Sequence, residues 1–162
     1  SYPTCRICGG RKVTRDAWAC WNSMTCAWSL SATFDTFFCD ACGECSVDWH
    51  VDEAFRRQRI RRLNDAMRHG DLKNGSVVVT VGLRSLGDAA LKQVAQAVAA
   101  FDDFGDDNDP HKEHDFGAIE IAGQKVFWKI DYFDQALERH SPDAANPDVT
   151  HRVLTLMLAS EY

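Results

Sequence analysis

Apolar positions after residue 47 follow first a helical and then an extended period, and they predict helices and strands in turn. Residues 48–69 repeat apolar side chains about every 3.6 residues and end before a glycine, so they predict a long helix. Residues 76–83 form a β-branched run that predicts a buried strand. Residues 85–101 are alanine-rich and amphipathic, which predicts a second helix.

Two more elements are expected further along the chain. Residues 116–134 alternate apolar and polar side chains around residues 123–124, which predicts a hairpin. Its core face is expected to carry Ile119, Ile121, Val126 and Trp128. Asn146 followed by Pro147 is typical of a helix start, so a last helix is expected there. Its buried face is expected to carry Val149, Val153, Leu156 and Met157.

The first third of the chain is rich in aromatic residues at strand-favouring positions. Residues 12–31 read as strand, turn and strand, with the reversal at residues 22–25. A further strand is expected over residues 33–38. This segment therefore predicts a β-hairpin that leads into a second cysteine pair.

Two C-x2-C pairs enclose this hairpin and predict a metal site. Cys5 and Cys8 form the first pair, Cys39 and Cys42 form the second, and a glycine follows each. Four thiolates in two tight turns suit tetrahedral ligation, so a structural Zn²⁺ ion is the expected cofactor. Disulfides or buried free thiols are the alternative interpretation.

Three cysteines lie outside these pairs. Cys20 and Cys26 flank the expected turn and are interpreted as spare thiols or a weak cross-strand pair. Cys45 follows Cys42 closely and is a competing ligand, although a small buried thiol is favoured because four cysteines already fill a tetrahedral site.

The pattern as a whole predicts an α+β fold in two parts. A zinc ribbon is expected over residues 1–47, followed by an α+β domain over residues 48–162 that opens with the helix. This domain is expected to pack a small antiparallel sheet of about three strands against helices. No long apolar run or signal-peptide pattern occurs, and paired cysteines favour a reducing compartment, so a cytoplasmic protein is expected.

Charge is unevenly distributed along the chain. The net charge is -6, yet residues 1–70 carry ten Lys or Arg against eight Asp or Glu. Residues 71–162 carry eight against sixteen. The basic part and the acidic part are therefore expected to meet different partners, and the acidic part repels phosphate.

The expected first helix contains six arginines between positions 56 and 68. Arg57, Arg61 and Arg68 fall together on the side away from the apolar face. One interpretation is a solvated face whose arginine stems cover apolar surface. The other is a contact surface for phosphates or for an acidic protein.

Residues 102–115 form an acidic segment broken by Gly105 and Pro110. A divalent metal is one interpretation, but the segment lacks the ligand rhythm of a Ca²⁺ loop and the helical H-E-x-x-H pattern of catalytic zinc. A partner-binding loop is favoured. Its candidate contact residues are Asp106, Asp107, Asp109, Glu113, His114 and Asp115.

Two parts of the chain resemble known groups of proteins. Residues 5–42 resemble the zinc ribbons of small bacterial and phage proteins, through DAWACW at 16–21, WSL at 28–30 and FD at 34–35. Residues 60–162 resemble an uncharacterised bacterial domain family, found in short proteins that are frequent on mobile elements. The matching segments are 59–66, 101–104, 107–110, 113–117, 128–132 and 152–159.

Three functions are weighed on these grounds. The favoured one is a non-enzymatic interaction protein, linked to mobile elements, that docks on a basic or nucleic-acid-binding protein surface, for example as an inhibitor of a CRISPR defence. The alternative is a regulatory protein that binds DNA or RNA directly through residues 1–70. A hydrolase centred on Glu113, His114 and Asp115 ranks last, because no nucleophile motif or phosphate loop accompanies them.

Overall fold

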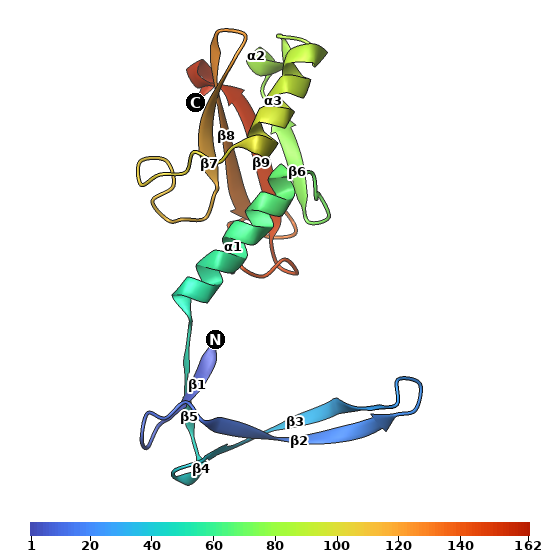
Figure 1. The fold of residues 1–162 in the computed structure, drawn as a ribbon, viewed down its shortest axis with the longest axis vertical. Coiled ribbons are helices and arrows are strands. Elements are labelled where there is room, and N and C mark those ends of the chain that lie inside the picture. The colour runs from blue at the N-terminus through green and yellow to red at the C-terminus, as the bar shows by residue number, and fades with distance from the viewer. The chain divides into compact units, whose positions relative to one another are not determined.

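The computed structural model describes residues 1–162 and divides the chain into two compact units (Figure 1). Unit 1 is Ser1–Asp52 and contains strands only. Unit 2 is Glu53–Tyr162 and combines helices with a sheet. The α+β fold class is confirmed.

Unit 1 is built around a long antiparallel hairpin. Strands β2 (Val13–Asn22) and β3 (Ala27–Cys39) pair along most of their length, and β4 (Gly43–Cys45) pairs with the end of β3. The Asn22 side chain shapes the turn, since its Oδ1 accepts the N–H groups of Met24 and Thr25 at 2.9 and 3.2 Å. Strands β1 (Tyr2–Cys5) and β5 (Val47–His50) form a second, two-stranded sheet.

Unit 2 contains a four-stranded sheet in the order β6-β9-β8-β7. These strands are β6 (Gly75–Val79), β7 (Phe116–Ile121), β8 (Gln124–Phe133) and β9 (His151–Leu158). Strand β6 runs parallel to β9 and the other pairs are antiparallel. The helices are α1 (Glu53–Arg68), α2 (Val81–Arg84) and α3 (Asp88–Ala100), and a 3-10 turn η1 (Ala159–Glu161) follows β9.

The core of unit 2 joins the helices to one face of this sheet. It contains Met67 from α1, Leu83 from α2, Val94 and Val98 from α3, Val126, Trp128 and Ile130 from β8, and Leu154 and Leu156 from β9. The fully buried indole of Trp128 lies opposite Gly117, where a Cβ atom would come within 2.6 Å of the ring. The core face expected for this hairpin is therefore confirmed, and the missing side chain of Gly117 gives the indole its space.

The turn of this hairpin lies one residue earlier than expected, at Ala122 and Gly123. Ile121 pairs with Gln124, and the two turn residues have φ values of 53° and 73°. Positive φ at both positions is the geometry of a two-residue turn whose twist matches the strands.

The helix expected after Asn146 and Pro147 is wrong. Residues 151–158 form β9, which lies inside the sheet between β6 and β8. Arg152, Leu154 and Leu156 are buried at alternate positions, which is the period of a strand. The Asn146 side chain accepts the N–H of Asp148 and forms a turn rather than a helix cap.

Two other expected boundaries change, and so does the composition of the sheet. The helix expected over 48–69 begins at Glu53, because residues 47–50 pair with β1. The strand expected over 76–83 ends at Val79, and α2 follows it. The sheet also has four strands and one parallel pair, since β9 joins β6 to the hairpin.

Candidate metal centre and charged surfaces

Four cysteines converge in unit 1 from two tight turns. Cys5 ends β1, Cys39 ends β3, and Cys8 and Cys42 lie in the turns that follow these strands. The N–H of Cys5 bonds the Gly10 carbonyl, and the N–H of Cys42 bonds the Cys39 carbonyl. The glycine after each pair has a φ of 71° or 79°, a conformation that glycine adopts without a Cβ clash.

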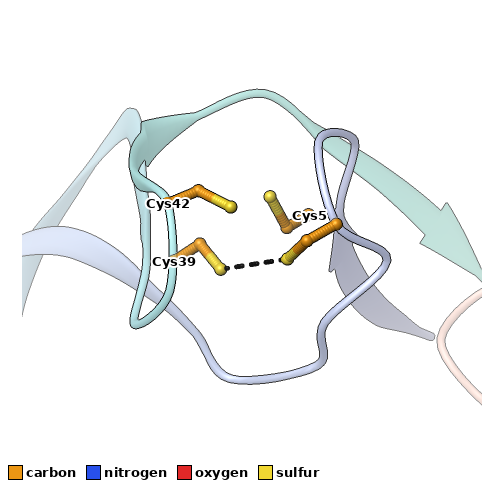
Figure 2. A group of neighbouring side chains, drawn as sticks. Cys5, Cys39 and Cys42 are labelled. Carbon is orange, nitrogen blue, oxygen red and sulfur yellow. Dashed lines mark hydrogen bonds between the residues drawn. The ribbon is translucent and has the colours of Figure 1, made fainter.

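The sulfur atoms of Cys5, Cys8, Cys39 and Cys42 lie within 4.8 Å of one another, and the Cys8 and Cys39 sulfurs are 3.6 Å apart. Figure 2 shows Cys5, Cys39 and Cys42 directing their sulfur atoms toward a common centre. Tetrahedral ligation with metal–sulfur bonds of about 2.3 Å requires sulfur separations of about 3.8 Å. The four thiols therefore fit one tetrahedral metal ion.

Close packing shifts the thiol pKa values in opposite directions. Hydrogen bonds, led by the backbone N–H of Cys8, lower the pKa of Cys5 to about 6. A hydrogen bond with Cys8, together with burial, raises the pKa of Cys42 to about 12. Neighbouring thiolates repel one another, so the four thiols do not all ionise together without a counter-charge. A metal cation bound between them supplies that charge and favours the thiolate form.

The three other cysteines do not join this group. Cys20 and Cys26 are exposed on the hairpin, and Cys45 is half-buried on β4, where it pairs with Phe37. Burial, followed by the neighbouring Cys5 thiol, raises the pKa of the Cys45 thiol, so Cys45 borders the group of four without being one of its members. None of the seven cysteines forms a disulfide.

Unit 2 orders the acidic segment, residues 102–115, by burying part of it. Asp109 is buried, and its Oδ1 accepts the N–H groups of Glu113 and His114 at 2.8 and 3.1 Å. The His114 ring stacks on Phe104 with centroids 3.6 Å apart, and its Nδ1 lies 2.9 Å from Asp65 Oδ1. Asp109 and His114 therefore hold the segment in place. Both were expected from the sequence as candidate partner contacts, and this structural role was not predicted for them.

Glu113 and His114 have different partners. Glu113 Oε2 accepts the hydroxyl hydrogen of Tyr132 at 3.1 Å, while His114 faces Asp65. The Asn64 amide donates to the Tyr132 hydroxyl and to the Glu113 carbonyl, and Arg152 donates to Asn64 Oδ1. This network of Asn64, Tyr132 and Arg152 was not predicted. An asparagine on the apolar face of a helix was its one visible signal.

Asp115 adds a further carboxyl to this region. Burial, followed by the charges of Glu113 and Asp109, raises the pKa of Asp115 above its ordinary value. Asp115 directly precedes β7, and its carbonyl accepts the N–H of Ile130 at 2.7 Å.

The remaining carboxylates of the segment point to solvent. Asp102, Asp103, Asp106 and Asp107 are exposed and form no ion pair. Asn108 fixes the backbone between them, because its side chain accepts the N–H of Gly105 and donates to the Asp103 carbonyl. We call these four aspartates the acidic loop.

The six arginines of α1 differ in burial and in partners: Arg56 pairs with Asp143, Arg68 is buried, and the other four are exposed. Arg57 and Arg61 are exposed without ion pairs, as are Arg59 and Arg62. Arg59, Arg61 and Arg62 line an open cavity of about 410 Å³ together with Phe55, Gln58 and Asp65. We call Arg57, Arg59, Arg61 and Arg62 the arginine stripe; Arg57 and Arg61 lie on one side of α1, and Arg59 and Arg62 extend the stripe around the helix.

Arg68 does not belong to the stripe, so its expected solvent position is wrong. Its side chain is 3% exposed, and its guanidinium donates to the carbonyls of Val98 and Phe101 and to Asp65. The same group lies 5.0 Å from the Phe104 ring centre and 5.2 Å from that of Trp128. Arg68 therefore joins α1 to the end of α3.

Comparison with known proteins places the chain in one family. Residues 79–161 match a family described as protein of unknown function (DUF3768), which covers about half of the chain, so the chain belongs to that family. The match lies inside unit 2 and begins after the residue 60 expected from sequence, and residues 5–42 match no family model. No curated protein and no solved structure matches significantly. The structure has no helix long and apolar enough to cross a membrane.

Proposed function

We propose that this protein is a non-enzymatic, zinc-binding interaction protein that docks on the basic surface of a nucleic-acid-processing protein. The acidic loop carries this proposal. Its four carboxylates are exposed and unpaired, while the buried Asp109 and the stacked His114 hold the surrounding backbone. An ordered anionic surface binds a cationic groove with less loss of conformational freedom than a flexible one.

Zinc has a structural role in this proposal. Four sulfur donors and the spacing of the sulfur atoms suit Zn²⁺, and a site with four protein ligands leaves no position for a reacting water. The cytoplasm, where thiols stay reduced, suits such a site.

The partner class follows from charge. Residues 71–162 carry twice as many acidic as basic residues, so this part of the chain favours cationic protein surfaces and repels nucleic acid. A protein that covers a nucleic-acid channel in this way acts as a decoy. Inhibition of a CRISPR effector by a protein of a mobile element is one concrete form of this function.

Neutralising the acidic loop is expected to abolish partner capture. Replacing Asp102, Asp103, Asp106 and Asp107 with Asn removes four charges without removing a side-chain bond. Affinity purification from the host after nuclease treatment, followed by mass spectrometry, should recover the partner with the wild-type protein. The amount of partner recovered with the variant should be at least about tenfold lower. The matched control removes the same number of charges at four exposed carboxylates outside the acidic loop: Asp88→Asn, Glu120→Gln, Glu138→Gln and Asp148→Asn. Equal recovery with all three proteins contradicts the proposal.

Direct nucleic-acid binding is the second candidate, and the arginine stripe supports it. Four exposed guanidiniums without ion pairs on one helix are free to contact phosphates. Nucleic acid would then bind to α1 rather than to the acidic remainder of unit 2, residues 71–162, and the affinity would fall steeply as the salt concentration rises.

Charge reversal in the stripe tests this candidate. Arg57→Glu with Arg61→Glu is expected to weaken binding to a labelled random duplex by more than about tenfold and to flatten the salt dependence. The control is Arg84→Glu with Lys92→Glu, which changes the net charge equally at exposed positions outside the stripe. Binding that is equal in both double variants, or absent in wild type, assigns the stripe to solvated surface.

A further inference from the structure

The outer part of the β2–β3 hairpin has a composition unlike the rest of the chain. Residues 17–34 contain no Asp, Glu, Lys, Arg or His, and no other segment of this length lacks them. The same segment contains Trp18, Trp21 and Trp28. Figure 1 shows this part of unit 1 as a two-stranded ribbon, since β4 pairs only with residues 37–39 of β3.

One face of this ribbon is apolar and uncovered. Trp21 pairs with Trp28 across the strands, with ring centres 5.7 Å apart, and Ala19 pairs with Leu30. Residues two apart in a strand lie on the same face, so all four side chains share it. Trp21 is 54% exposed, Trp28 71% and Leu30 69%. We call this surface the tryptophan face.

The chemistry of the tryptophan face selects its occupant. Single-stranded nucleic acid needs cations along its backbone beside the stacking rings, and residues 17–34 supply none. A basic protein surface would find no carboxylate there. When two copies of this face meet, no like charges face each other and no charge is buried without a partner. The rest of the chain carries a net charge of -6, so two copies repel each other elsewhere.

We infer that the tryptophan face is the interface between two copies of this chain. The two ribbons stack face to face about a two-fold axis, as sheets pack at about 10 Å. Trp21, Trp28 and Leu30 of each copy cover those of the other. This interface is independent of the charged-surface docking proposed above.

The size of the face determines the strength of the dimer. Since one Trp side chain buries up to about 250 Å², the exposed fractions of Trp21 and Trp28 leave roughly 300 Å² uncovered. Leu30 and the small residues beside it raise the contact to roughly 500 Å² per copy, below the ~800 Å² of a stable complex. The dimer is therefore weak and depends on protein concentration.

Analytical ultracentrifugation of the full zinc-loaded chain tests the inference. A reductant that does not bind zinc is present, because the exposed Cys20 and Cys26 would otherwise cross-link copies. From about 1 µM to about 300 µM, the wild-type mass is expected to rise from 18.2 kDa toward twice that value. Trp28→Lys is expected to raise the dissociation constant by more than about 30-fold.

Two further variants make the result specific. Leu30→Lys adds the same charge at another position of the face and should also give a monomer, with zinc content confirming that each variant is folded. Val81→Lys adds this charge at a residue that is 85% exposed in unit 2 and should leave the dimer unchanged. A wild type that stays monomeric throughout the range overturns the inference, including when the hairpin then binds another protein or a lipid vesicle. A Val81→Lys effect as large as that of Trp28→Lys also overturns it.

Discussion

Replacing Cys5 or Cys42 with serine is expected to release the metal and to unfold unit 1 while unit 2 stays folded. The reason lies in the distribution of buried apolar residues. The only buried apolar residues of unit 1 are Cys5 and Cys39, and both belong to the candidate metal centre. A unit of this size without an apolar core depends on its metal, and structural zinc contributes about 10–16 kcal/mol to folding in zinc-finger peptides.

The measurement combines metal content with residue-level structure. Mass spectrometry of the metal should give one zinc ion per wild-type chain and at most a small fraction of one per Cys5→Ser or Cys42→Ser chain. In ¹H–¹⁵N spectra, amide signals of residues 13–39 should collapse into the narrow range of unfolded chains. Signals of unit 2 should keep their positions, since its core contains no residue of unit 1.

Cys20→Ser is the control, because Cys20 is exposed on the hairpin and lies outside the cysteine group. This variant should retain both metal and hairpin. A Cys5→Ser protein that keeps the hairpin would contradict a structural metal, and one that keeps the ion would contradict the assignment of its ligands.

The sequence predicted those features that depend on neighbours along the chain. The two cysteine turns were predicted from the C-x2-C spacing and from the glycine that follows each pair. Both glycines have a positive φ in the structure. The core face of the β7–β8 hairpin follows from alternation alone, because Val126 and Trp128 lie two residues apart in one strand.

Features that depend on distant partners were missed. Residues 151–158 carry both Leu154 and Leu156 at strand spacing and Val153 and Met157 at helical spacing, so local periodicity did not decide between the two. Pairing with β6 on one side and β8 on the other decides it in the fold. The boundary of α1 was missed for the same reason, since only β1 shows that residues 47–50 are a strand.

The position of Arg68 also depends on distant partners and could not be predicted from the sequence. It is the basis of the second large effect that we expect, a loss of stability in Arg68→Ala. Helical periodicity places Arg68 away from the apolar face, yet carbonyls from the end of α3 and the rings of Phe104 and Trp128 enclose it. Burial raises the pKa of its partner Asp65, but hydrogen bonds from Arg68 and His114 outweigh this, and the pKa of Asp65 lies below its ordinary value. Arg68 thus links α1, α3 and the acidic segment.

Arg68→Ala is therefore expected to lower the free energy of unfolding of unit 2 by about 3–5 kcal/mol, as removal of one partner from a buried charged network does. The carbonyls of Val98 and Phe101 lose the Arg68 donor, the Asp65 carboxylate keeps only His114, and a cavity opens beside Trp128. Urea unfolding followed by helical circular dichroism measures the loss. Arg68→Met separates packing from hydrogen bonding, since it refills the space without supplying donors.

Arg61→Ala is the matched control, since it removes an exposed arginine from the same helix and should change stability by less than about 0.5 kcal/mol. Acid pH gives a second check on the cause. A carboxyl with a lowered folded pKa contributes stability above its unfolded pKa and loses it as pH falls through the folded value. The difference in unfolding free energy between wild type and Arg68→Ala should therefore narrow in that acid range, because protonated Asp65 loses its ion pair with Arg68 in the wild type. The part of the difference due to the two carbonyl bonds should remain. A gap that is small at neutral pH, or equal to that of Arg61→Ala, would contradict the buried position of Arg68.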